Sequence, residues 1–137
     1  MEATQFERLA VYQLSEKLAD EVWEIVLQWP HLARDTVGKQ LIRAADSIGA
    51  NLAEGSGRGT YQDNRRFVRI ARGSLYETKH WLRRAFKRRL LDGSSVALLK
   101  PVTDELAPRL NAYLKSIGKS NPKPNLSPSP SQLTTDN

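Results

Sequence analysis

Apolar residues recur at intervals of three and four along four long stretches of this 137-residue chain, and no stretch alternates as a strand does. Such spacing is typical of an α-helix that buries one face, because 3.6 residues complete each turn. The pattern predicts an all-α protein. Four amphipathic helices with short connections favour an antiparallel up-down four-helix bundle, which we place at residues 1–118.

The first predicted helix covers residues 6–29 and stops at Pro30, which cannot continue a helix. Its two apolar rows together cover roughly half of the helix circumference. Because a surface helix of a monomer needs a stripe of only ~100°, the extra width indicates contact with a second subunit. The first row is Val11, Leu14, Leu18, Val22, Ile25 and Trp29, and the second is Tyr12, Ala19, Trp23 and Val26.

The second predicted helix, residues 36–54, carries a row of large apolar residues and a row of small ones. The large row is Val37, Leu41, Ala44, Ile48 and Leu52, and the small row is Ala45, Gly49 and Ala53. Small residues let two helix backbones approach closely, which is a reason to keep a mid-helix glycine that costs about 1 kcal/mol. We assign this small row, with Tyr12 and Trp23, to an oligomer interface.

The remaining predicted helices cover residues 60–90 and 95–117. The expected core positions of the third are Phe67, Ile70, Ala71, Ser74, Leu75, Thr78, Trp81, Leu82 and Ala85; those of the fourth are Leu99, Val102, Leu106, Leu110, Leu114 and Ile117. Pro101 and Pro108 each remove a backbone donor, so we expect the fourth helix to kink or split. Residues 119–137 are rich in Pro, Ser and Asn, which predicts a disordered tail.

Basic residues concentrate in one part of the chain. The formal net charge is +6, but residues 65–89 alone hold ten Lys/Arg and one acid, Glu77, and so carry +9. Six of these cations fall within an arc of roughly 80° along ~33 Å of the third helix, with Tyr76 inside the arc. They are Arg65, Arg69, Arg72, Lys79, Arg83 and Lys87. Arginine forks onto phosphate oxygens, so this stripe predicts nucleic-acid binding, with Tyr76 available to stack on an unpaired base.

Two other interpretations of the stripe remain open. It could be a solvated outer face of the bundle. It could instead dock on acidic residues of the first helix of a neighbouring subunit, and such a head-to-tail contact would close a ring. Those acidic residues are Glu16, Asp20, Glu21 and Glu24. The alternative function is therefore an oligomeric interaction scaffold without a nucleic-acid role.

The sequence offers little chemistry for an enzyme. The chain has no cysteine and two histidines, which excludes thiolate metal sites and a cysteine nucleophile. The polar row Arg43, Ser47, Asn51 and Glu54 favours a structural network in which Glu54 pairs with Arg58 or Arg72. Glu77 and His80 have the Glu-x-x-His spacing of di-iron bundles, but such sites need a second copy of the motif. We expect a non-enzymatic protein without catalytic residues, cofactor or metal.

The hydropathy pattern indicates a cytoplasmic protein without a membrane partner. No apolar run approaches the ~18 residues of a membrane span, and the acidic, amphipathic N-terminus lacks a signal-peptide core.

Three stretches, residues 6–13, 40–55 and 66–77, resemble the small bacterial four-helix-bundle proteins. The most specific is Ser47-Ile-x-x-Asn51-Leu-Ala-Glu54-Gly55. That family includes proteins encoded within intervening sequences of large-subunit ribosomal RNA genes and accessory variability proteins of diversity-generating retroelements. The resemblance implies a bundle that assembles into a ring, commonly a homopentamer. For the retroelement branch it also implies a basic surface that binds nucleic acid and a reverse transcriptase.

Overall fold

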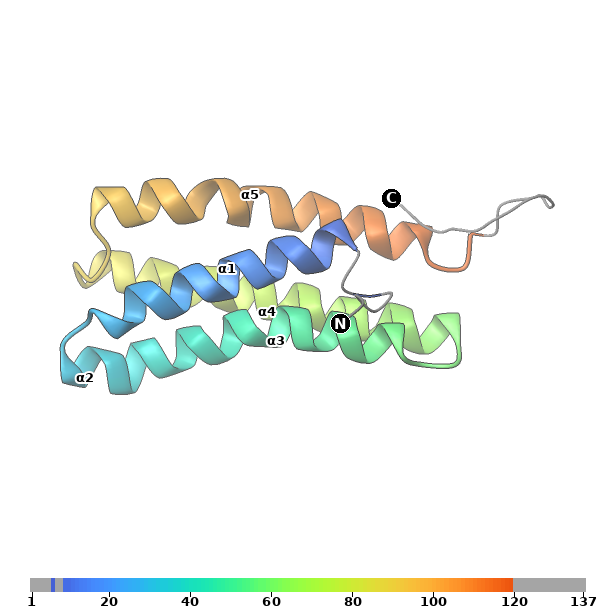
Figure 1. Cartoon of the computed structure of the whole chain (residues 1–137), viewed down its shortest axis with the longest axis horizontal. Coiled ribbons are helices and arrows are strands. Elements are labelled where there is room, and N and C mark those ends of the chain that lie inside the picture. Colours follow the sequence, from blue (N-terminus) through green and yellow to red (C-terminus); the bar gives the residue numbers. More distant parts are fainter. Residues whose placement is uncertain (1–5, 7–8, 120–137) are drawn as a thin grey trace, which may run out of the picture.

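Four long helices run lengthwise beside one another in a computed structural model that describes residue 6 and residues 9–119 (Figure 1). They are α1 (Ala10–Leu27), α3 (Lys39–Ser56), α4 (Tyr61–Lys87) and α5 (Gly93–Ser116). No strand occurs among the described residues, so the predicted all-α four-helix fold is confirmed. Of the predicted tail at 119–137, all but Lys119 lies outside the described residues.

Each long helix packs against two others, in the order of a closed square. Helix α1 lies beside α3 and α5, and α4 lies beside the same two, whereas no Cα atoms of α1 and α4 come within 8 Å of each other. In Figure 1 the turn after α1 and the turn before α5 lie at one end of the bundle, and the α3–α4 turn lies at the other. The helices are therefore antiparallel, and the outer faces of α1 and α4 point to opposite sides.

The second helical segment begins earlier than the apolar pattern predicts. A short helix α2 (His31–Ala33) directly follows Pro30, and a π-helical turn η2 (Arg34–Gly38) joins it to α3. A π turn adds one residue to the helical repeat and so shifts which residues face inward. Two consecutive residues of this turn, Val37 and Gly38, are buried. A prediction based on a regular 3.6-residue period does not include this extra residue.

The bundle interior is filled by side chains from all four long helices. The largest fully buried apolar residues are Leu18, Leu41, Ile48, Leu52, Leu75, Leu106 and Leu110. On α4 the prediction for Ile70 is wrong, because its side chain is 42% exposed, while the neighbouring Val68 is fully buried instead. The buried face of α4 runs through Val68, Ala71, Leu75, Thr78 and Ala85, which turns Ile70 toward the outside.

Helix α5 is not split by its two prolines, so the split, one of the two expected outcomes, does not occur. Pro101 and Pro108 both lie inside one continuous helix, and both are exposed. Each proline leaves the carbonyl four residues before it without a helical donor. Those carbonyls belong to Ala97 and Asp104, which are exposed residues, so water can satisfy them.

In the described part of the chain, no helix is long and apolar enough to cross a membrane.

Candidate functional site

Helix α4 is the scaffold that positions most of the basic residues. It has 27 residues and is therefore about 40 Å long. Thr60 caps its N-terminus, since the Thr60 Oγ1 accepts a hydrogen bond from the Asp63 amide at 3.1 Å. Arg84 and Lys87 lie in the last turn, where positive charge complements the helix dipole. One long, well-capped helix therefore holds these cations in a fixed row.

The outward side of α4 carries cations that the fold does not use. Arg69, Arg83 and Lys87 are exposed and have no hydrogen bond or ion pair to any described residue. Tyr76 lies between them on the same side, 55% exposed. We name the set Arg69, Gly73, Tyr76, His80, Arg83 and Lys87 the α4 outer face. Its unpaired charges are free to meet a partner outside the chain.

Arg88 and Arg89 add two exposed cations in the turn after the helix, where Arg89 also lines the groove between α1 and α5. Both are exposed, and Arg89 has a left-handed backbone with φ of 63°. The predicted stripe omitted them because, on a helix predicted to run to residue 90, they fall outside the 80° arc, whereas α4 ends at Lys87. Their presence in the basic run of residues 65–89 was the available signal.

Two residues of the predicted stripe instead brace α4 against α5. The Arg65 Nη1 donates to the Ile117 carbonyl at 3.0 Å, and the Arg72 Nη1 donates to Asn111 Oδ1 at 3.0 Å. Both arginines are half-buried, as is Lys79. The predicted stripe therefore divides into a structural edge and a free outer face.

A half-buried tyrosine, Tyr113, also joins the contact between α4 and α5. Tyr113 Oη lies 3.5 Å from Asn64 Nδ2, and burial raises the pKa of Tyr113 against the lowering effect of that hydrogen bond. The amide oxygen of Asn64 is buried without a partner among the described residues.

The predicted polar row on α3 does not link helices. Arg43 donates to the Gln40 side chain, Ser47 to the Arg43 carbonyl and Asn51 to the Ser47 carbonyl. These hydrogen bonds all stay within the same helix. The predicted pairing of Glu54 is confirmed for Arg58, with 3.1 Å between the guanidinium and the carboxylate. Arg58 and Arg66 also stack over the Phe67 ring, at 4.8 and 4.6 Å from its centroid.

The small-residue row assigned to an oligomer interface lies mainly inside the chain. Ala45 is 1% exposed, and a Cβ added at Gly49 would lie 3.1 Å from Ser15 Oγ and 3.3 Å from Tyr12 Cε1. We therefore correct this assignment: Ala45 and Gly49, with the half-buried Ala53 on the same row, let α3 pack closely on α1.

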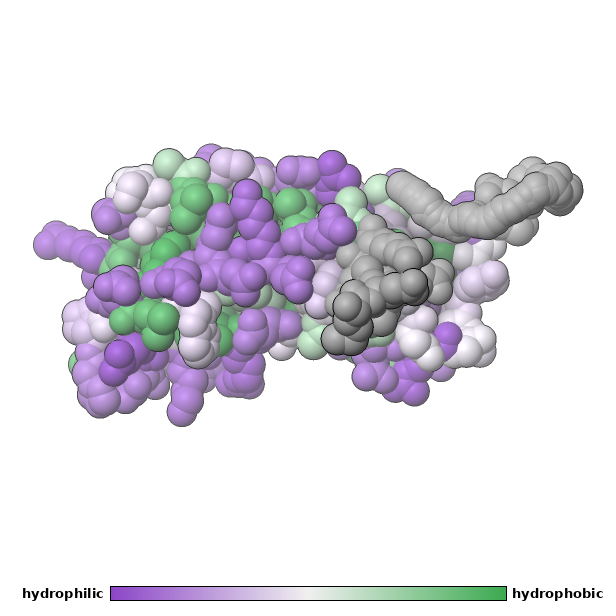
Figure 2. Space-filling model, viewed as in Figure 1, coloured by the Kyte–Doolittle hydropathy of each residue, from purple (hydrophilic) through white to green (hydrophobic). Residues whose placement is uncertain are grey.

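Trp23 is the exposed member of the predicted interface. Its side chain is 49% exposed and lines a shallow groove between α1 and α3 with Ile42, Asp46 and Ala50. Burial, together with the nearby Asp20 carboxylate, raises the pKa of Asp46. Figure 2 shows the α1 side of the bundle, where hydrophobic side chains are exposed between hydrophilic ones.

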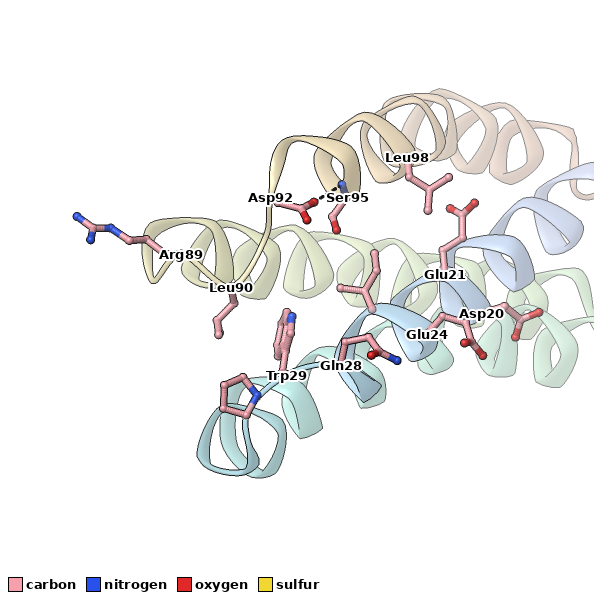
Figure 3. A pocket seen from close by; sticks show the side chains of 12 residues that line it. Asp20, Glu21, Glu24, Gln28, Trp29, Arg89, Leu90, Asp92, Ser95 and Leu98 are labelled. Atoms are coloured by element: carbon pink, nitrogen blue, oxygen red, sulfur yellow. Dashed lines mark hydrogen bonds between the residues drawn. The ribbon is translucent and has the colours of Figure 1, made fainter.

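An acidic groove lies between α1 and α5 and reaches the α4–α5 turn, where Arg89 and Leu90 also line it. It has a volume of about 680 Å³, and Figure 3 shows its acidic lining around the apolar side chain of Leu98. The carboxylates are those of Asp20, Glu21, Glu24 and Asp92. Asp92 caps α5 by accepting from the Ser95 amide at 2.8 Å, and this hydrogen bond holds the pKa of Asp92 below its usual value.

Glu21 is a partly buried carboxylate of this groove. Its Oε1 is buried and has no hydrogen-bond partner in the described part of the chain. Burial raises the pKa of Glu21, and the attraction of Lys17 offsets this effect in part. The ionised form is thus less favourable in the folded chain than in the unfolded chain.

We expect Glu21→Gln to stabilise the bundle at neutral pH. A raised carboxyl pKa means that ionisation opposes folding, fully above the folded-state pKa and not at all below the unfolded value of about 4.3. The gain in Tm over the parent should therefore be present at pH 7 and vanish below about pH 4. Thermal unfolding from pH 3 to 8 checks it, with the exposed Glu24→Gln as control. A gain that persists at pH 3 would contradict the explanation.

Glu77 and His80, the Glu-x-x-His pair of α4, both contact Trp81. The Trp81 Nε1 donates to Glu77 Oε2 at 3.3 Å, and the His80 ring meets the Trp81 ring edge-on at 4.8 Å. Across the described ranges, no three His, Asp or Glu residues come close enough together to hold a metal ion.

Comparisons with known proteins identify a matching family model and solved structures of similar fold. The model of the 23S rRNA-intervening sequence protein family matches residues 7–112. No curated protein matches the chain. Among solved structures, a protein of unknown function from the S23 ribosomal protein family of Bacteroides thetaiotaomicron is similar, with a TM-score of 0.69. It is 20% identical, and the match covers 77% of this chain and 99% of that one, which is a likeness of fold.

Proposed function

Because the chain belongs to the 23S rRNA-intervening sequence protein family, we propose that it is a non-enzymatic accessory protein that binds RNA. The match over most of the chain confirms the resemblance drawn from residues 40–55. The α4 outer face, together with Arg88 and Arg89, is the proposed binding surface.

The observation that carries this proposal is a set of exposed cations whose side chains make no hydrogen bond or ion pair with a described residue. Arg69, Arg83, Lys87, Arg88 and Arg89 are all exposed. The three on α4 span 18 residues, or about 27 Å along the helix. The fold gains nothing from this repulsion, whereas a phosphate backbone would release counterions on binding each cation. A row of charges along a helix contacts the phosphate backbone more than the base edges. We therefore expect little preference for nucleotide sequence.

The proposal includes assembly into a homo-oligomer in the cytoplasm. The ring of five subunits and a reverse transcriptase partner follow from the family resemblance. Support from the fold is narrower: Trp23 and Leu27 are 49% and 41% exposed on the outward side of α1. Light scattering after gel filtration should report more than one chain per particle at micromolar concentration, and a monomer there would contradict assembly.

A protein-interaction scaffold is the second candidate. The acidic groove is lined mainly from α1 and α5, and the basic α4 outer face lies on another helix, so the two surfaces could meet head-to-tail between copies. In that case the cations would be neutralised by carboxylates of a neighbour. The oligomer would then dissociate with rising salt, and RNA would not bind.

The test is fluorescence anisotropy with a labelled structured RNA and a duplex DNA, titrated across salt. If five cations contact phosphates, log K should fall with log salt at a slope of about −3.5 to −4.5. No binding at low salt would overturn the RNA proposal and leave the scaffold as the better account. Binding with a flat salt dependence would remove the α4 outer face from the interface.

A further inference from the structure

Gly73 lies in the middle of α4, on its exposed side, where a glycine weakens the helix relative to alanine. Three other glycines inside the helical segments have a packing reason, whereas Gly93 is the first residue of α5 and has open space around it. A Cβ would approach a side chain of another helix to 2.6 Å at Gly38, 3.1 Å at Gly49 and 2.6 Å at Gly55. At Gly73 a Cβ would meet nothing within 4 Å. Packing within the chain therefore does not account for this glycine.

At Gly73 no side chain covers the helix backbone, and the side chains one turn away border this uncovered position. Its neighbours one turn away on the helix surface are Arg69, Ile70, Tyr76 and Glu77. Tyr76 is 55% exposed and Ile70 is 42% exposed. We name the backbone at Gly73, with Arg69, Ile70 and Tyr76, the Gly73 notch. It offers one cation, one aromatic ring and one aliphatic side chain around a place without a side chain.

We infer that the Gly73 notch binds an unpaired nucleotide of RNA. The base stacks on the Tyr76 ring, the ribose lies against the bare backbone at Gly73, and a flanking phosphate reaches Arg69. This inference rests on the proposed RNA-binding function. It goes further by assigning one face of α4 to single-stranded RNA.

The chemistry of the notch favours an unpaired nucleotide over a duplex. Base stacking on an aromatic side chain needs an exposed base face, which a duplex covers with its own stacking. Phosphate contacts alone need only the cations and would gain nothing from Tyr76 or from a missing side chain. The notch therefore adds to affinity only where a nucleotide is single-stranded.

The positive charge around the notch favours a polyanion over a second copy of α4. A partner with the same basic helix would place Arg69 and Arg83 against like charges, which is unfavourable. The one acid beside the notch, Glu77, accepts a hydrogen bond from Trp81 Nε1 at 3.3 Å. That bond draws its carboxylate one turn further along the helix, away from Gly73.

The test compares Gly73→Ala with the parent, using a labelled 12-nucleotide single-stranded RNA and the same strand in a duplex. The variant should unfold at a Tm a few degrees higher, because alanine suits a helix interior better. Its Kd for the single strand should rise about five- to tenfold, while its Kd for the duplex stays within about twofold. Binding and stability thus move in opposite directions, so loss of folding cannot explain the result.

Further variants separate the parts of the notch. Gly59→Ala is the matched control, since a Cβ there also meets nothing within 4 Å but lies in the turn before α4. Tyr76→Ala should lose as much single-strand affinity as Gly73→Ala, and Tyr76→Phe should keep it, because phenylalanine retains the stacking face.

Each outcome decides the inference. If Gly73→Ala binds the single strand as tightly as the parent while the parent binds RNA, the notch is wrong and the RNA-binding proposal stands. If the parent binds no RNA, both fall. If Gly73→Ala instead changes the mass of the particle in light scattering and leaves RNA binding intact, the notch holds a second copy of the chain.

Discussion

Replacing Arg69, Arg83 and Lys87 together by glutamate should weaken RNA binding at least about 100-fold at moderate salt. Each substitution removes one cation from the α4 outer face and places a negative charge beside a phosphate. The loss of three phosphate contacts should also make the slope of log K against log salt shallower by about two to three. Anisotropy across a salt series measures both effects.

The choice of these three cations depends on the structure. Arg65 and Arg72 belong to the same stripe in the sequence, but they hydrogen-bond to Ile117 and Asn111 of the C-terminal segment. Reversing them would loosen α5, and a loss of binding would then have two explanations. Arg69, Arg83 and Lys87 are exposed, and their side chains make no hydrogen bond or ion pair with a described residue.

A control triple separates a local effect from a change in net charge. Lys17, Lys39 and Lys115 are exposed and lie on α1, α3 and α5. Their replacement by glutamate also takes the formal net charge from +6 to zero. We expect the control to keep affinity within about tenfold of the parent. Equal losses in the two triples would show that only net charge matters and would contradict a binding face on α4.

Gly55→Ala should lower the free energy of unfolding by about 1–3 kcal/mol, the usual cost of overpacking a filled site. A Cβ at Gly55 would lie 2.8 Å from the Phe67 Cβ and 2.6 Å from Asn64 Oδ1. The amide of Asn64 can rotate, but the Phe67 Cβ is fixed by its own backbone. Helices α3 and α4 must therefore separate to admit one methyl group.

The same substitution at Gly73 is the matched comparison for stability. Both glycines lie within helices, but the space at Gly73 is open and the space at Gly55 is filled. Urea unfolding should show Gly55→Ala below the parent and Gly73→Ala above it, with unchanged m-values. If both variants gain stability, the close approach of α3 and α4 at Gly55 does not limit the fold.

The helical pattern of the sequence was sufficient for the fold class. Apolar residues at three- and four-residue spacing must be covered, and four such helices with short turns cover one another in a bundle. Positions near the middle of an apolar face, such as Leu18, Ile48 and Leu75, were predicted correctly because every packing of that face buries them. The basic run at residues 65–89 was likewise visible without coordinates.

Residues at the edges of a helix face required the tertiary structure. Arg69 and Arg72 lie only about 60° apart on the helix, yet one is free and the other reaches Asn111, because only the second lies beside α5. Ile70 was predicted to lie in the core but is exposed, and the neighbouring Val68 is buried instead.

Periodicity fixes the angle of each residue around its own helix, whereas its surroundings depend on where the neighbouring helices lie. The small residues show this most clearly. Gly49, Gly55 and Gly73 look alike in the sequence, but two are enclosed by other helices and one faces open space. The sequence by itself determined which segments are helices and which faces are apolar or basic. Only the packing of α4 between α3 and α5 decided which cations and which glycine remain free for a partner.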